Sequence, residues 1–349
     1  MGEPVDLVID PVTREKLRIE LPLRIEPDTE RLRSALGVPT FVDLSDPLVA
    51  KALALEYWAQ QNGKSGPALA FLGGVAHRLR CASSNDGSSG LRRSLHDLDV
   101  ACLHREIRAT VAFLKSVGDH AGSGVKVFET PGDRVFNSLQ GGRRQRYHTL
   151  LAPADGGIAL GIVDLLADEF EFCHRLDLRA DVSAARERGY TLSLALLLLA
   201  KLQYIQRIPA TDGPRVSDRV LEPFGKHELL IGAESKDMQD VLAILADHDF
   251  GDDANSVSLT AIDQLLHDDW GLWKTVGLNL DAIQRSRVLT GVRADLRERI
   301  LPRLATLRER VRSLSPKRRF GFFQPQWWQQ VDSAGPSPTS AAVDRSNPS

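Results

Sequence analysis

Asp97 and Asp99 are the residues whose types and spacing point most directly to chemistry in this sequence. They lie in the segment HDLDVAC, residues 96–102, where acidic and apolar side chains alternate. Alternate residues of a β-strand face the same way, so both carboxylates would leave one face of a sheet together. Like charges on one face repel, and a cation would relieve that repulsion. Carboxylate oxygens suit Mg²⁺, which shares its coordination shell with substrate phosphates.

Two glycines and a third aspartate strengthen this interpretation. Gly73 and Gly74 follow an apolar segment and precede a helical one, an arrangement that lets backbone N–H groups approach a phosphate. Asp164 lies in an apolar strand segment, where an unpaired carboxylate is costly. In this order the residues predict a metal and triphosphate site, with Asp97, Asp99 and Asp164 as metal ligands. The open alternative is an ordinary edge strand with surface acids.

The elements that must position these residues form two halves that meet near residue 190. The first half alternates strands and helices, and the second is helical, which predicts an α/β (α+β) chain. Strands are expected at residues 68–72, 95–103, 125–129, 135–139, 147–151 and 158–166, and a helix at residues 106–117. Helices are expected at residues 192–206, 236–247, 259–266 and 269–280, followed by a basic helical pair.

This reading divides the chain into residues 1–190, residues 191–332 and a tail. The first is a mixed sheet with helices, and the second is a helical domain interrupted by an inserted loop with one short helix, residues 207–233. Residues 333–349 are rich in Ser, Pro, Ala and Asp and lack a hydrophobic period, which predicts a disordered tail.

The order of glycine turn, Asp-x-Asp strand and further Asp resembles the nucleotidyltransferase superfamily. More closely, the chain resembles the AbiEii-type nucleotidyltransferase toxins, over roughly residues 65–285. Further similar segments are residues 136–141, 168–178, 197–203, 236–241 and 268–273. The resemblance implies a nucleotidyltransferase fold followed by a helical domain, with the active site between them.

The resemblance also implies roles for individual residues. Gly74, with Gly73 beside it, would contact the triphosphate, and Asp97 and Asp99 would hold Mg²⁺. Lys201 would reach the nucleotide phosphates, and Asp240 would complete the catalytic set from the helical half. The residues agree for Lys201, because it follows an apolar helical run and its ammonium needs an anion. A snorkelling lysine is the alternative.

The charge of the chain is balanced overall but uneven. Its 349 residues carry 44 Lys and Arg against 46 Asp and Glu, a net charge of −2. Residues 284–319 alone hold 12 Lys and Arg and 3 Asp and Glu, a local +9. Apolar residues recur there at helical spacing, and Pro302 predicts a kink or a split. The stretch is either a solvated face or a surface for RNA or an acidic partner.

Cysteine use and hydropathy indicate a cytoplasmic protein. Three cysteines without a CxxC spacing argue against a disulfide framework or a cysteine zinc site. The N-terminal residues lack the apolar core of a signal peptide. The most apolar stretch, residues 192–200, is about half of the roughly 20 residues that a membrane span needs.

Three other groups of residues are weaker candidates. Two glycines precede Arg143, Arg144 and Arg146, which are expected to bind nucleotide phosphates or RNA backbone, with a solvated hairpin turn as the alternative. Of the three, Arg143 is the predicted nucleotide ligand. Adjacent Cys173 and His174 would point apart on an extended segment, which predicts a structural role rather than a catalytic pair. The aromatic residues around position 327 are expected to pack against a helix end rather than to stack bases.

The function predicted from these observations is Mg²⁺-dependent transfer of NMP from an NTP to an acceptor. RNA, such as a tRNA 3′ end, is the favoured acceptor, and the toxin resemblance implies a toxin–antitoxin or phage-defence protein with a cognate antitoxin partner. A small-molecule or protein hydroxyl acceptor and a non-catalytic nucleotide-binding regulator are the alternatives.

Overall fold

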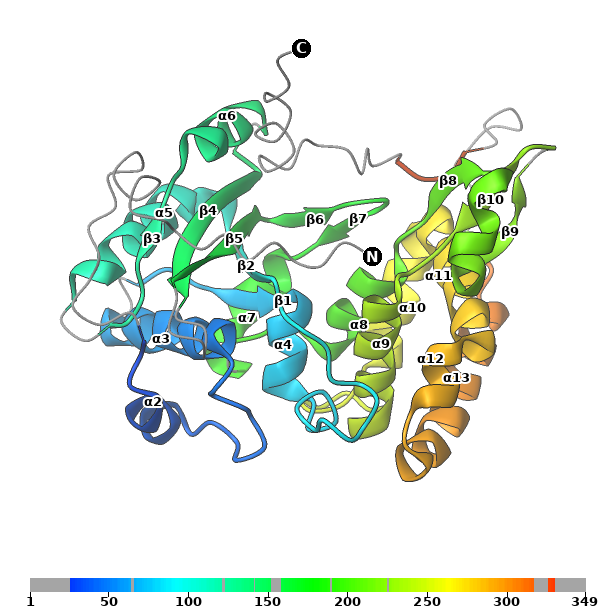
Figure 1. Cartoon of the computed structure of the whole chain (residues 1–349), viewed down its shortest axis with the longest axis horizontal. Coiled ribbons are helices and arrows are strands. Elements are labelled where there is room, and N and C mark those ends of the chain that lie inside the picture. Colours follow the sequence, from blue (N-terminus) through cyan, green and yellow to red (C-terminus); the bar gives the residue numbers. More distant parts are fainter. Residues whose placement is uncertain are drawn as a thin grey trace, which may run out of the picture.

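The computed structural model describes residues 26–63, 66–120, 123–140, 142–151, 158–188, 190–224, 226–316 and 326–329. It has the mixed α/β character that the sequence predicts. Figure 1 shows a sheet-containing half, in blue to green, beside a half in which helices prevail, in green to orange. The predicted tail lies outside the described residues.

The first half is built on a mixed five-stranded sheet. Its strands are β1 (Ala70–Leu72), β2 (Asp97–Cys102), β3 (Val127–Phe128), β4 (Arg144–Leu151) and β5 (Ala159–Ala167). Their spatial order is β1-β2-β5-β4-β3. Only β2 and β5 run parallel, and the other neighbours are antiparallel. On β2 the alternation is as predicted, because Leu98, Val100 and Cys102 are fully buried in the core.

Helices and a short hairpin surround this sheet. The helices are α2 (Thr29–Leu36), α3 (Pro47–Gln61), α4 (Gly73–Arg80), α5 (Ile107–Ser116), α6 (Pro131–Leu139) and α7 (Arg179–Arg188). Two 3₁₀ turns, η2 (His104–Glu106) and η3 (Val117–Asp119), flank α5, and β6 (Glu169–Glu171) pairs with β7 (Arg175–Asp177). Figure 1 shows α4 directly below the β1 end of the sheet.

The strand predicted at residues 135–139 is wrong, because this segment belongs to helix α6. Thr130 accepts a hydrogen bond from the Asp133 backbone, and the Asp133 side chain accepts one from the Thr130 backbone, which forms a capping box. Pro131 stands at the first helical position, where its missing N–H costs nothing. Val135 and Leu139 remain exposed, so their apolar character did not report a buried strand.

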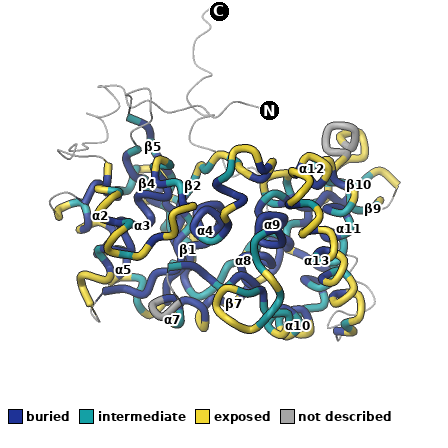
Figure 2. The backbone as a smooth tube through the Cα atoms, turned by 90° about the horizontal axis from the view of Figure 1, so that it is seen from below, coloured by how far each residue is buried: buried dark blue, intermediate teal, exposed yellow. Residues whose placement is uncertain are grey.

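The second half contains six helices among the described residues. They are α8 (Leu194–Leu202), α9 (Ser235–Asp247), α10 (Leu259–Asp268), α11 (Trp270–Arg285), α12 (Arg287–Gly291) and α13 (Ala294–Ser313). Helices α8, α9 and α4 contact one another, and Figure 2 shows α4, α8 and α9 together near the middle of the molecule. This contact brings residues of the second half to the sheet.

Two details of the second half differ from the predictions. The segment predicted as a loop insertion is a three-stranded antiparallel sheet, β8 (Gln206–Pro209), β10 (Glu228–Ile231) and β9 (Val220–Phe224), with the 3₁₀ segment η4 (Ala210–Arg219). Pro302 does not split the basic helix, which runs through it as α13, and the break falls at Val292 instead. Buried Ile300 and Leu304 on either side hold α13 against the core, which offsets the lost backbone hydrogen bond.

One hydrophobic core runs through both halves. The connected cluster of buried side chains includes Leu32 of α2, Val100 of β2, Leu198 of α8 and Val311 of α13. The change near residue 190 is therefore a change of secondary structure within a continuous core. Among the described residues, none of the helices is long and apolar enough to cross a membrane.

Candidate functional site

The register of the sheet places the predicted acidic residues in one row. Asp99 of β2 lies opposite Leu72 of β1 on one side and opposite Asp164 of β5 on the other. Asp164 in turn lies opposite Arg146 of β4. Residues paired across a sheet share a face, so this row crosses four strands with its acids and its arginine on the same side.

Asp97 and Asp99 line a pocket and stand without a counter-ion. Within the described residues neither carboxylate forms a hydrogen bond or an ion pair. Burial, together with the charges of Asp97 and Asp164, raises the pKa of Asp99 to about 8. Two adjacent oxygen donors that repel each other fit a hard divalent cation such as Mg²⁺.

The glycine turn lies directly against this pair. Gly73 has a φ of 64°, in the left-handed range, and a Cβ there would overlap the Oδ2 atom of Asp99. A Cβ on Gly74 would overlap the guanidinium of Arg93. Helix α4 starts at Gly73, and no side chain caps its N-terminus. Gly73 and Gly74 both line the pocket, and uncapped N–H groups at a helix N-terminus can bind an anion.

Asp164 is placed beside Asp99, but its carboxylate is already bound. Arg146 Nε donates to Asp164 Oδ1 at 2.8 Å, and Arg144 Nη2 donates to Oδ2 at 2.6 Å. Burial would raise the pKa of Asp164, yet these two arginines hold it below its usual value. No cluster of three or more His, Cys, Asp or Glu side chains suited to a metal ion occurs in the part of the chain that the structure describes. The predicted third metal ligand is thus an arginine-bound carboxylate.

Asp240 lies behind the pocket rather than in it. It is 2% exposed, and Arg93 binds it through Nε at 2.9 Å and Nη2 at 2.8 Å. Lys201 Nζ lies 3.0 Å from its Oδ2 atom. Burial favours the neutral carboxyl, but these cations outweigh it and hold the pKa of Asp240 well below the usual range. The structure therefore gives Asp240 the geometry of a positioning residue, not of a group that meets substrate.

Lys201 does reach the pocket, as the sequence predicts. Its ammonium binds both Asp237 Oδ1 and Asp240 Oδ2 at 3.0 Å, and its side chain is 14% exposed. Burial alone would lower the pKa of Lys201, but these two carboxylates raise it above the ordinary value. The lysine is a fixed positive charge in the lining of the pocket.

Arg143 does not line the pocket, and its neighbour Arg144 does. The guanidinium of Arg143 is largely exposed and binds Glu169 at 3.2 Å. Successive residues at the start of a strand face opposite sides, so the predicted phosphate ligand is displaced by one position. Arg144 keeps one hydrogen bond to Asp164 within this pocket.

Several lining or supporting residues were not predicted. Arg93 and His77 gave no pattern in the sequence, because they come from a loop and a helix that only the fold brings to the site. Asp237 lies in the similar segment 236–241, but the sequence assigned no role to it. His77 is buried, and its Nδ1 atom lies 2.7 Å from the Gly73 carbonyl oxygen; burial lowers the pKa of this imidazole, so the neutral ring donates from Nδ1. The remaining walls are aromatic or charged: Phe170, Phe172, Tyr204, Glu234 and Lys236. The pocket encloses about 260 Å³.

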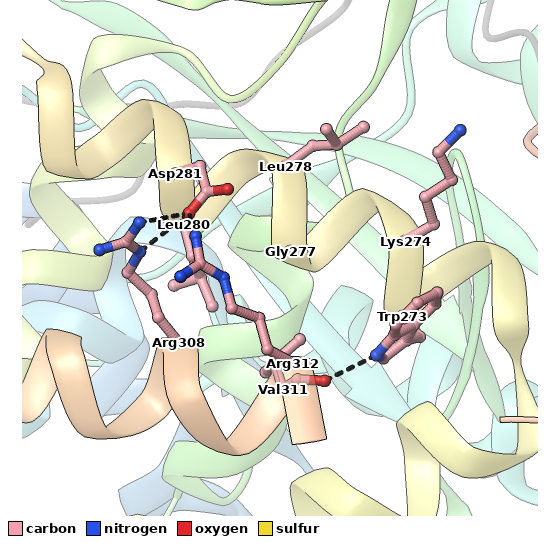
Figure 3. Close-up of a pocket in the computed structure, with 9 residues that line it drawn as sticks. All are labelled: Trp273, Lys274, Gly277, Leu278, Leu280, Asp281, Arg308, Val311 and Arg312. Carbon is pink, nitrogen blue, oxygen red and sulfur yellow. Dashed lines mark hydrogen bonds and ion pairs between the residues drawn. The ribbon is translucent and has the colours of Figure 1, made fainter. Parts of the chain in front are cut away.

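A second cavity, of about 160 Å³, lies between α11 and α13. Figure 3 shows that the guanidinium groups of Arg308 and Arg312 both turn toward Asp281. Trp273 donates from its indole nitrogen to the Val311 carbonyl oxygen at 2.7 Å. This cavity therefore lies over an ion-paired helix contact, and none of the residues predicted for the metal and triphosphate site lines it.

The weaker candidates behave as structural residues. Cys173 Sγ contacts the Ile205 carbonyl oxygen at 3.2 Å, and His174 Nε2 lies 2.9 Å from Thr275 Oγ1, as the structural interpretation predicts. Trp327 and Trp328 are buried against one another, and Trp327 donates to the same Thr275 hydroxyl at 3.1 Å. The packing role predicted for these tryptophans is confirmed.

Comparison with known proteins adds no family to this description. No protein-family model matches the chain, and no curated protein shows significant similarity to it. The resemblance to nucleotidyltransferase toxins therefore supports a proposal and does not assign a family.

Proposed function

We propose that the protein is an Mg²⁺-dependent nucleotidyltransferase that moves NMP from an NTP to an acceptor hydroxyl and releases pyrophosphate. The observation that supports this most is the position of Asp97 and Asp99. They are two carboxylates without a counter-ion, side by side in a pocket, against the uncapped N-terminus of α4. A cation that binds there with its phosphates would neutralise the two carboxylates, which explains why they have no counter-ion of their own.

Each wall of the pocket has a part in this proposal. Asp97 and Asp99 would hold the metal, and the first N–H groups of α4 would bind phosphate oxygens. Lys201 and Arg144 would face the triphosphate from opposite sides. A bound Mg²⁺ would neutralise the triphosphate and orient it for displacement. The acceptor oxygen would form a bond to the α-phosphorus as the bond to the β-phosphate bridging oxygen breaks, and the hydroxyl proton would pass to solvent.

Asp240 supports this arrangement from behind. It anchors Arg93 and Lys201 together, and a Cβ on Gly74 would overlap that same Arg93. The ammonium of Lys201 is therefore held in position before any ligand binds, because Asp237 and Asp240 both bind it. A preorganised cation costs little reorganisation when the substrate arrives.

RNA remains the proposed acceptor on the basis of the toxin resemblance, not of the basic helix. The arginines of that stretch are largely paired with acids, as in Arg293 with Asp86 and Arg308 with Asp281. A cognate antitoxin partner and a cytoplasmic location are likewise proposals. The three cysteines are free and buried, which is compatible with a reducing compartment.

Incubation with each α-labelled NTP, Mg²⁺ and total tRNA tests the proposal. Label should move to RNA in the wild type and not in the Asp99→Asn variant, with pyrophosphate released in equal amount. A matched control is Asp119→Asn, an exposed acid outside the pocket, which should keep full activity. Turnover by Asp99→Asn at the wild-type rate would contradict the proposal.

One observation favours a second candidate, a nucleotide-binding regulator that does not transfer NMP. Asp164, the third acid of the row, is bound by two arginines, which leaves two carboxylates for a metal. Such a protein would bind NTP with Mg²⁺ but release no pyrophosphate with any acceptor. Pyrophosphate measurement in the same assay separates the two functions.

A further inference from the structure

Three aromatic rings line the pocket that holds Asp97 and Asp99. Phe170 lies on β6, Phe172 lies just after it, and Tyr204 follows α8, three residues beyond Lys201. The rings of Phe170 and Phe172 are nearly parallel, 3° apart in plane and 6.2 Å between centroids. Phe172 and Tyr204 are 5.6 Å apart and tilted by 31°. We call Phe170, Phe172 and Tyr204 together the aromatic wall.

The aromatic wall is neither sealed in the core nor spread on the open surface. All three residues are half-buried, and the guanidinium of Arg219 lies 5.4 Å from the centre of the Tyr204 ring. The hairpin β6–β7 and the end of α8 fix the rings from two directions. The other lining residues are mostly charged or glycine, so the rings are the large flat apolar surface of an otherwise polar pocket.

We propose that the aromatic wall binds the base of the nucleotide by stacking, and that it prefers purines. This inference rests on the proposed function and names the substrate class of the same site. Every base presents a π-face to an aromatic ring, and a purine covers more of it than a pyrimidine does. Tyr204 and Lys201 leave the same end of α8, so one element fixes the distance between base and phosphate contacts.

Calorimetric titration in Mg²⁺ tests the proposal with ATP, GTP, CTP, UTP and inorganic tripolyphosphate, in the absence of any acceptor. The variant is Phe172→Leu, which keeps apolar volume but removes the flat ring, and Phe172→Tyr is the conservative variant. Phe41→Leu, an exposed phenylalanine outside this pocket, is the matched control. Melting temperatures verify that all three variants fold.

The expected result is that wild type binds ATP and GTP more tightly than CTP and UTP, and tripolyphosphate least. Phe172→Leu should weaken ATP binding about fivefold or more and leave tripolyphosphate affinity unchanged. Phe172→Tyr and Phe41→Leu should bind ATP as wild type does.

Two results would overturn the inference, and they have different consequences for the proposed function. If ATP and tripolyphosphate bind equally, and Phe172→Leu changes neither affinity, the aromatic wall does not bind the base, although the triphosphate site stands. The rings would then serve another ligand, such as the acceptor. If neither ATP nor tripolyphosphate binds the wild type, the proposed function fails together with the inference.

Discussion

Strand β2 and helix α13 carry their charges in opposite ways. On β2, Asp97 and Asp99 stand side by side without a counter-ion within the described residues. On α13, Arg303, Arg308 and Arg310 each bind an acid of a neighbouring element. Within the described residues most arginines of this basic stretch are thus paired with acids, whereas two carboxyl groups on β2 are left next to each other. Unpaired like charge, rather than charge density, marks the candidate site.

The comparison extends to the acids that bind two cations each. Asp240 binds Arg93 and Lys201 at 3% side-chain exposure, and Asp281 binds Arg308 and Arg312 at 32%. The two clusters have similar composition but different solvent screening. Burial should make the first far more costly to break than the second.

Asp240→Asn tests this contrast with the largest expected effect. It leaves Lys201 and Arg93 buried without their shared charge, so the free energy of unfolding should fall by about 3 kcal/mol or more. Denaturant unfolding measures the change. The matched variant Asp281→Asn should cost about 1 kcal/mol, and equal losses in the two variants would remove the distinction between the clusters.

Lys201→Met should have the next largest effect. It keeps the apolar stem but leaves Asp240 with one cation fewer, at a cost of about 2 kcal/mol. ATP binding should weaken about tenfold, because a charge-assisted contact to phosphate is lost. Calorimetry measures this affinity, with Lys115→Met, an exposed lysine outside the pocket, as the control. Wild-type affinity in Lys201→Met would remove this residue from the phosphate site.

The double change Arg308→Gln and Arg312→Gln addresses the helix contact. Burial raises the pKa of Asp281, but hydrogen bonds from these arginines lower it below its ordinary value. A lowered carboxyl pKa gives stability that is present above about pH 4 and is lost as the pH falls through the folded pKa. The double variant should be about 1 kcal/mol less stable at pH 7.

The dependence of stability on pH at acid pH can contradict this role of Arg308 and Arg312. Between pH 5 and pH 3 the double variant should lose less stability than wild type, because Asp281 no longer has a depressed pKa to lose. Unfolding measured at several pH values across this range tests the sign. Parallel curves for the two proteins would show that these arginines do not stabilise the ionised Asp281.

Asp99→Asn should have the smallest effect on stability. Burial, and then the charges of Asp97 and Asp164, disfavour the ionised form of Asp99 and raise its pKa to about 8, so a neutral amide suits this position. Without Mg²⁺ the variant should be no less stable than wild type, within about 1 kcal/mol. A clear fall in the melting temperature would mean that Asp99 has a structural role.

The pattern of apolar and polar residues predicted strands β2 and β5 but not helix α6. The alternation in β2 and the apolar run of β5 predicted both strands, whereas only the family resemblance implied that the strands of Asp99 and Asp164 are neighbours. Helix α6 was mistaken for a strand because exposed Val135 and Leu139 mimic a buried pattern, while the capping box at Thr130 was the signal that could have corrected it.

The site could be predicted only where its residues share a strand or a turn. Gly73, Asp97 and Asp99 are set by local geometry, whereas the Arg93–Asp240 pair joins residues 147 positions apart. The occupancy of Asp164 by Arg144 and Arg146 depends on the register of β4 against β5, which a one-residue slip would abolish. The same one-residue sensitivity put Arg143 in the place of Arg144.

The most direct test of the central claim is the affinity for ATP measured with and without Mg²⁺, in wild type and in the Asp97→Asn, Asp99→Asn double variant. The account predicts that Mg²⁺ strengthens ATP binding by wild type at least about tenfold, as for a cation that bridges carboxylates and phosphates. The folded double variant should lose this dependence on Mg²⁺. ATP binding by wild type that is equal with and without Mg²⁺, or a double variant with the full Mg²⁺ effect, would contradict it.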